Sequence, residues 1–134
     1  MRDRSSVVII EHNKVVLIRR NRNGSIYYVF PGGGIERGED PKYAAKREAL
    51  EELGVEVKVS DCLTEAAFEG NTQYFFLAEI IGGILGTGQG EEYTDETRGR
   101  GTYQPIWIDI QALTSLDVRP IEVALNIQSL FRPT

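Results

Sequence analysis

The chain has 134 residues, of which 41% are hydrophobic and 26% are charged, and 15 basic against 20 acidic side chains give a net charge of −5. This composition is typical of one soluble globular domain and excludes a disordered chain, while no apolar run approaches the roughly 18 residues of a membrane span. The acidic balance, without a basic block, argues against a nucleic-acid polymer as the main partner.

We therefore expect a single domain over residues 1–134. The first four residues lead directly into an apolar run and do not resemble a signal peptide, so we expect a cytoplasmic location. Cys62 is the only cysteine, which excludes an internal disulfide and a cysteine-based zinc cluster. We expect it to be a small buried hydrophobic residue.

The first elements in the chain are predicted to be strands. Residues 7–10 and 15–18 are apolar and β-branched and are separated by a turn-like tetrapeptide, which predicts a β-hairpin. His12 lies in this turn, where no neighbour would orient it, so we expect no catalytic role for it. Residues 26–30 predict the next strand, which ends at Pro31 and the glycine triplet at residues 32–34.

A helix of three to four turns is predicted next. Asp40 can cap its first N–H groups, Pro41 suits its first turn, and Gly54 supplies its end. Further strands are predicted at residues 55–59, 73–81 and 107–109.

Arg119 and Pro120 open a final amphipathic helix. Strands interspersed with helices predict an α/β fold with a mixed sheet between helical layers. Residues 82–101 form a long, glycine-rich connection, and connections of this length are usually functional or disordered. This connection carries four acidic residues, Glu91, Glu92, Asp95 and Glu96.

Three carboxylates share one side of the first predicted helix. Glu48, Glu51 and Glu52 are spaced i, i+3 and i+4, so they point in one direction. The residues expected to pack on the sheet lie in the opposite sector: Tyr43, Ala49, Leu50 and Leu53. A solvated acidic face is the alternative interpretation, because most charge-rich helix faces are solvated.

Two pairs of like charges argue against that alternative. Glu48 with Glu52, and Glu52 with Glu56, are i, i+4 pairs that destabilise a helix by roughly 0.2–0.5 kcal/mol each, with no basic residue at those offsets. A bound cation would reverse this effect, and oxygen ligands at this density suit Mg²⁺ or Mn²⁺ rather than zinc. The glycine triplet beside them can adopt backbone angles closed to other residues, so a main-chain carbonyl can turn to a metal and a phosphate can approach the chain at Gly33 and Gly34.

The spacing from residue 33 to residue 55 matches a known pattern. Gly33 is followed after five residues by Glu39 and after seven more by the sequence Arg-Glu-Ala-Leu-Glu-Glu-Leu-Gly-Val, which is G-x5-E-x7-R-E-U-x-E-E-x-G-U with U a bulky apolar residue. On these residues the chain resembles the Nudix hydrolase family (MutT-like), with its Nudix box at residues 33–55. Ala49 is the one departure, because a larger apolar residue is usual there.

The resemblance implies an α/β Nudix fold, in which a mixed β-sheet is sandwiched between helices (α/β/α), and a metal-dependent pyrophosphohydrolase. Its cofactor would be Mg²⁺, with Mn²⁺ as a substitute, and its metal ligands would be Glu48, Glu51, Glu52 and the carbonyl of Gly32. Glu39 and Arg47 would hold the loop against the helix and orient the ligands. Glu52 would be the best candidate in the box for deprotonating the attacking water. Some family members take the base or a further ligand from outside the box, which leaves the four acids of the long connection as candidates.

The substrate class implied is a nucleoside diphosphate derivative: a nucleoside triphosphate, a nucleotide sugar or a dinucleotide. Arg19 and Arg20 are candidates for phosphate contacts, and Phe30 is one of several aromatic candidates for stacking on a base. The start of the last helix offers one acid and no aromatic, which disfavours oxidised nucleotides without excluding them. A catalytically silent Nudix-fold module that binds a nucleotide is the alternative function. Family members often form homodimers, but the sequence identifies no interface.

Overall fold

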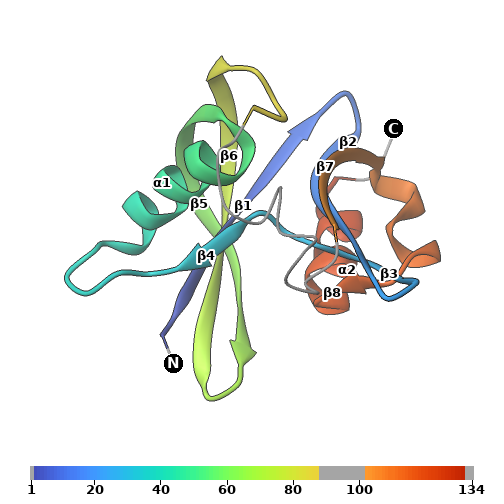
Figure 1. The fold of residues 1–134 in the computed structure, drawn as a ribbon, viewed down its shortest axis with the longest axis horizontal. Coiled ribbons are helices and arrows are strands. Elements are labelled where there is room, and N and C mark those ends of the chain that lie inside the picture. The colour runs from blue at the N-terminus through green and yellow to red at the C-terminus, as the bar shows by residue number, and fades with distance from the viewer. Residues whose placement is uncertain (1, 88–101, 132–134) are drawn as a thin grey trace. The chain divides into compact units, whose positions relative to one another are not determined.

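The computed structural model describes residues 2–87 and 102–131, and the chain divides into two compact units (Figure 1). The first unit comprises residues 1–9 and 31–90, and the second comprises residues 10–30 and 91–134. The candidate acids Glu91, Glu92, Asp95 and Glu96 lie outside the described residues. The prediction of a single domain stays a prediction.

The first unit is a mixed sheet with one helix packed on it. Strand β5 (Val55–Phe68) pairs antiparallel with β6 (Asn71–Gly83), β6 pairs parallel with β1 (Arg4–Glu11), and β1 pairs antiparallel with β4 (Gly32–Gly34). Helix α1 (Pro41–Leu53) packs on β5 and β4 (Figure 1). The strands β5 and β6 form one long hairpin, in which β5 extends well beyond the predicted run at residues 55–59 and β6 only slightly beyond the predicted run at residues 73–81.

The glycine triplet forms strand β4 and not the expected turn. None of its three residues has a φ angle in the left-handed region. Glycine is required here for space, because a Cβ atom on Gly32 would collide with the Ser5 carbonyl oxygen and the Ser6 hydroxyl oxygen. The absence of side chains therefore lets β4 lie close against β1.

Both predicted ends of helix α1 are confirmed. The Asp40 carboxylate accepts a hydrogen bond of 3.2 Å from the backbone N–H of Lys42, and Pro41 occupies the first turn. Gly54 ends the helix with a left-handed φ of 78°. Glu56 therefore lies beyond the helix in β5, and the predicted repulsion between Glu52 and Glu56 on one helix face is wrong.

The packing side of α1 was predicted partly wrongly. Ala49 and Leu53 are buried as expected, together with Ala44 and Ala45. Tyr43 and Leu50, however, are 61% and 57% exposed. The buried side of α1 is formed mainly by alanines, whose small side chains let the helix backbone approach the sheet. Tyr43 and Leu50 lie outside this side.

The second unit has its own small sheet and core. Strand β2 (Lys14–Arg22) pairs antiparallel with β3 (Ser25–Val29) and with β7 (Thr102–Asp109), and β8 (Val118–Arg119) pairs parallel with β3. The predicted first hairpin is confirmed, since β1 and β2 pair around His12 and Asn13, which both have positive φ.

Helical segments complete the second unit. The 3₁₀ helix η3 (Ile110–Ser115), which the sequence did not predict, contacts α2 (Ile121–Leu130). The predicted start of α2 at Pro120 is confirmed. Its buried residues Val123, Ala124 and Ile127 follow helical spacing. Neither α1 nor α2 is long and apolar enough to cross a membrane, and the same holds for every helix in the part of the chain described.

Cys62 is exposed, so the prediction of a buried residue is wrong. The register of β5 against β6 shifts on both sides of Cys62, between Val59 and Cys62 and again between Cys62 and Thr64. Such irregularities change the direction in which side chains point along a strand. The sequence around Cys62 has no glycine or proline that would have indicated them.

The alanine face of α1 gives a testable expectation. Ala49→Leu restores the bulk that is usual in the family pattern, yet we expect it to lower the free energy of unfolding by about 1–3 kcal/mol, because this site is already closed against the sheet. Leu50→Ala, on the exposed side, should change it by less than about 0.5 kcal/mol. Urea unfolding of both variants tests this, and a stabilised Ala49→Leu protein would contradict it.

Candidate active site in the first unit

The loop between β4 and α1 is closed by Glu39. One oxygen of its carboxylate, Oε1, accepts hydrogen bonds from the backbone N–H of Glu36 at 2.9 Å and from Arg47 Nη2 at 2.8 Å. The other oxygen, Oε2, accepts from Arg47 Nε at 2.7 Å. This fork-to-fork pair fixes the loop to the middle of α1.

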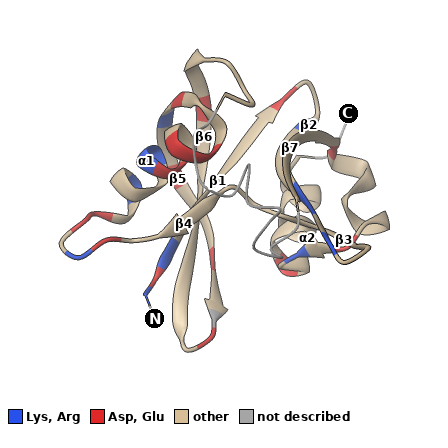
Figure 2. Ribbon diagram, in the orientation of Figure 1, with Lys and Arg blue, Asp and Glu red and all other residues tan. Residues whose placement is uncertain are grey.

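Arg47 uses all five of its N–H donors. Besides the two bonds to Glu39, Nη2 donates to the Gly34 carbonyl oxygen at 3.1 Å, and Nη1 donates to Glu48 Oε1 at 2.8 Å and to Glu51 Oε2 at 3.1 Å. One guanidinium therefore joins the end of β4, the loop and two carboxylates of α1. In Figure 2 acidic and basic segments lie together along this loop and helix.

These contacts shift the pKa values of both partners. The hydrogen bond from Arg47 is the main cause that lowers the pKa of Glu39 from 4.5 to about 2, and the Glu36 N–H acts in the same direction, against the effect of burial. The pKa of Arg47 is raised above its already high value, mainly by its hydrogen bond to Glu39 and then by Glu48. Both side chains are therefore ionised at neutral pH.

The three predicted metal ligands differ in environment. The side chain of Glu48 is 15% exposed and that of Glu51 is 54% exposed, whereas Glu52 is only 8% exposed. The Glu48 carboxylate lies against Gly33, where a Cβ atom would be 2.5 Å from Cδ of Glu48 and 2.6 Å from each of its oxygens. The structure thus needs glycine at residue 33 to leave room for a carboxylate.

The chemistry of these donors fits a hard divalent cation, although the three side chains do not converge. One oxygen of Glu48 and one oxygen of Glu51 both accept a hydrogen bond from Arg47 Nη1, so the two carboxylates already meet at one positive charge. Within the described ranges, however, no group of three or more His, Cys, Asp or Glu side chains is arranged to hold a metal ion. The structure therefore brings two of the predicted ligands to one point, while Glu52 is buried beside them on the same helix.

The predicted phosphate contacts Arg19 and Arg20 belong to the second unit, as does Phe30. The guanidinium of Arg20 lies 3.6 Å from the ring centre of Tyr103 and 5.5 Å from that of Tyr27, its direct cross-strand neighbours. Phe30 is 3% exposed and so offers almost no surface to a ligand in this structure.

A second arginine extends this arrangement. The guanidinium of Arg119 lies 4.1 Å from the ring centre of Tyr27 and forms two hydrogen bonds with Asp117, of 3.1 and 2.9 Å. These bonds lower the pKa of Asp117 and raise that of Arg119. These residues could not be grouped from the sequence, because β8 was not predicted.

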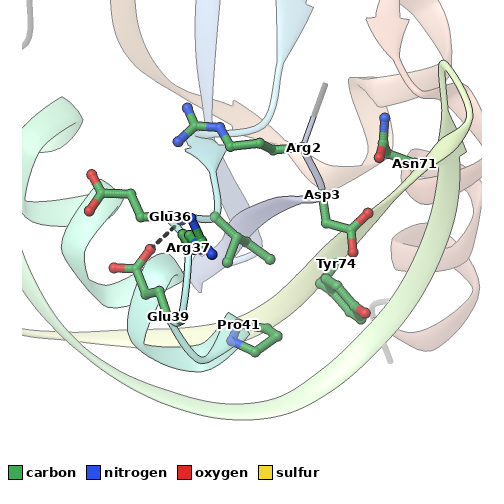
Figure 3. Close-up of a pocket in the computed structure, with 10 residues that line it drawn as sticks. Arg2, Asp3, Glu36, Arg37, Glu39, Pro41, Asn71 and Tyr74 are labelled. Carbon is green, nitrogen blue, oxygen red and sulfur yellow. Dashed lines mark hydrogen bonds between the residues drawn. The ribbon is translucent and has the colours of Figure 1, made fainter.

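A pocket of about 440 Å³ borders the loop of the first unit (Figure 3). Its walls come from the start of β1, the loop and β6: Arg2, Asp3, Ile35, Glu36, Arg37, Gly38, Glu39, Pro41, Asn71 and Tyr74. Asp3 accepts a 2.9 Å hydrogen bond from the Thr72 N–H, which fastens the two distant segments together. The sequence analysis missed this pocket, because only the parallel pairing of β1 with β6 brings these segments together.

Comparison with known proteins agrees with this geometry. The family model for the NUDIX domain matches residues 1–123. The chain is 27% identical over 129 residues to an RNA pyrophosphohydrolase of Pelagibacter ubique, covering 84% of this chain and 78% of that protein. It is also 27% identical over 125 residues to an 8-oxo-dGTP diphosphatase of Haemophilus influenzae, covering 81% and 83% respectively.

A solved structure supports the fold. A Nudix hydrolase from Nitrosomonas europaea superimposes with a TM-score of 0.74 at 20% identity, over 96% of this chain and 87% of that one. The α/β fold class predicted from the sequence is thus confirmed as a Nudix fold. The chain belongs to the Nudix family, and it is a hydrolase that acts on phosphoric anhydrides.

The shifted pKa of Glu39 predicts a specific pH dependence. Because the pKa falls from 4.5 to about 2 on folding, ionised Glu39 stabilises the fold above pH 4.5, and this contribution disappears as the pH falls toward 2. Glu39→Gln should lower the free energy of unfolding by roughly 1–3 kcal/mol at pH 7 and by much less near pH 2.5.

Urea unfolding from pH 2.5 to 7 measures this difference. Glu56→Gln is the matched control, because it removes an exposed carboxylate of the same unit that Arg47 does not contact. Parallel pH profiles for the wild type and Glu39→Gln would show that the Glu39–Arg47 pair does not stabilise the fold.

The contact between Gly33 and Glu48 predicts a conditional effect. Gly33→Ala should lower the free energy of unfolding by about 1–3 kcal/mol, because the new methyl group collides with the Glu48 carboxylate. In a Glu48→Ala background most of this loss should disappear, since the three nearest atoms all belong to Glu48. Thermal unfolding of the four proteins measures it, and an equal loss in both backgrounds would refute the contact.

Proposed function

We propose that this protein is a metal-dependent pyrophosphohydrolase that cleaves a diphosphate linkage in a nucleoside diphosphate derivative by attack of water on phosphorus. The observation that carries this proposal is the arrangement of Glu48 and Glu51 around one cationic nitrogen, with the Glu48 carboxylate held against Gly33. A diphosphate concentrates negative charge, so carboxylates alone would repel it. Cations between the carboxylates and the substrate overcome this repulsion.

The proposed metal ligands are Glu48, Glu51, Glu52 and the carbonyl oxygen of Gly32. Bound Mg²⁺ or Mn²⁺ would neutralise charge on the diphosphate and lower the pKa of a water molecule. Glu51 is half exposed and held by one hydrogen bond from Arg47, whereas Glu52 is buried. Burial limits the water around the Glu52 carboxylate, which suits a group that accepts one proton.

Other residues of the box position these groups. Arg47 and Glu39 lock the loop to α1, so that the spacing between β4 and the helix stays fixed when substrate binds. Gly33 and Gly34 leave room for the Glu48 carboxylate and the Arg2 guanidinium, so a phosphate at these glycines would meet a proposed metal ligand and a positive charge. In this proposal they bind the substrate, and Glu52 takes the proton of the attacking water.

The substrate is proposed to be a nucleoside triphosphate, a nucleotide sugar or a dinucleotide. Two proteins similar to this chain are named RNA pyrophosphohydrolase and 8-oxo-dGTP diphosphatase, and a nucleoside triphosphate and a 5′-triphosphorylated RNA end both contain phosphoric anhydrides. Arg19 and Arg20 are proposed to contact phosphate, and the stack of Arg20 with Tyr103 offers a flat surface on which a base can rest. The acidic net charge favours small nucleotides over a polymer.

The direct test compares Glu52→Gln with the wild type at saturating Mg²⁺. Release of phosphate or pyrophosphate is measured from a panel of nucleoside triphosphates, nucleotide sugars, dinucleotides and an RNA with a 5′-triphosphate. We expect kcat on the preferred substrate to fall by about 10²- to 10⁴-fold, because the proton acceptor is lost. Glu56→Gln removes an exposed acid just beyond the helix and should leave kcat unchanged.

Two other outcomes would overturn parts of this proposal. If Glu52→Gln retains full activity, Glu52 is not the base. If the wild type cleaves no member of the panel and yet one compound raises its melting temperature, the protein is a nucleotide-binding module without catalysis.

A further inference from the structure

Arg47 contacts two of the proposed metal ligands. Its Nη1 atom lies 2.8 Å from Glu48 Oε1 and 3.1 Å from Glu51 Oε2, so one positive nitrogen is shared by two proposed ligands. A divalent cation that binds the same two oxygens would repel the guanidinium and take over its acceptors. Arg47 and a metal ion therefore compete for the same atoms.

The contacts of Arg47 fall into two separable groups. Nε and Nη2 bind the Glu39 carboxylate and the Gly34 carbonyl, neither of which is a proposed metal ligand. Only Nη1 contacts Glu48 and Glu51. A metal ion can thus displace the two Nη1 bonds while the other three bonds continue to hold the loop on α1.

We propose that Arg47 is a built-in counter-ion, whose Nη1 group partly offsets the charges of Glu48 and Glu51 until a divalent cation replaces it. This inference rests on the proposed metal site. Arg47 offsets charge on two of the three clustered carboxylates of α1, whereas the sequence alone suggested only a bound cation for this role. A divalent cation would then bind by displacing the positively charged Nη1 group of Arg47, and not only by relieving repulsion between the carboxylates of α1.

The sign of one stability change distinguishes the two explanations. In EDTA, Glu48→Gln should lower the melting temperature by about 5 °C, because Arg47 loses an ionised acceptor. If the carboxylates only repelled one another, removing one charge would raise the melting temperature. Glu56→Gln, which removes an exposed acid that Arg47 does not contact, is the control and should shift it by no more than about 1 °C.

The exchange itself can be followed by ¹⁵N–¹H NMR of the arginine side chains, with Arg47 assigned by Arg47→Lys. During a Mg²⁺ titration the Nη1 protons of Arg47 should lose their slow exchange with water, whereas its Nε proton should stay protected by Glu39. Simultaneous loss of both signals, or protection of Nη1 at saturating Mg²⁺, would overturn the exchange.

These results separate the two proposals. If Mg²⁺ neither raises the melting temperature of the wild type nor changes any arginine signal, the proposed metal site fails, and the exchange fails with it. The Glu48→Gln result in EDTA then still decides whether Arg47 acts as a counter-ion. A melting temperature that is unchanged or raised in that variant would overturn this role even if Mg²⁺ binds.

Discussion

The ion pair between Arg47 and Glu39 is the interaction on which the rest of the first unit depends. A planar guanidinium with five fixed donors can satisfy a carboxylate, a carbonyl and two further acids at once, whereas a lysine ammonium has three donors and no planar fork. The pair joins three segments that are separated along the chain, namely β4, the loop and α1. This joint holds the acidic side of α1 next to the glycine strand, while the alanine side of the helix packs on the sheet.

Small residues set the distances around that joint. Gly32 lets β4 approach β1, Gly33 leaves space for the Glu48 carboxylate, and Ala44, Ala45 and Ala49 let α1 lie close to the sheet. A larger side chain at Gly33 or at one of the alanines would move the helix relative to the sheet, and one at Gly32 would move β4 away from β1. Glycine and alanine residues therefore determine the geometry of the site as much as the charged residues do.

Features that depend on residues close together in the sequence were predictable. Asp40, Pro41 and Gly54 define the ends of α1 through local capping, and the spacing of the box identified the family and the Glu39–Arg47 pair. The orientation of α1 was predicted less well, because helical spacing tells which residues share a side but not which side packs, and Tyr43 and Leu50 remain exposed. The pocket beside Asp3 and Tyr74 depends on pairing between distant strands, for which the sequence contains no local signal.

The burial of Glu52 links packing to chemistry. Glu52 lies in the sector of α1 that also contains Ala45, Ala49 and Leu53, so the acidic side and the packing side of the helix are adjacent and not opposite. A change at an alanine therefore acts on the carboxylates through the distance between α1 and β4. The small residue at position 49, which departs from the family pattern, fits this arrangement: a closer helix brings Glu48 against Gly33 and leaves Arg47 within reach of both Glu39 and Glu51. The alanine at position 49 thus has a structural reason in this chain, and it does not by itself indicate a damaged site.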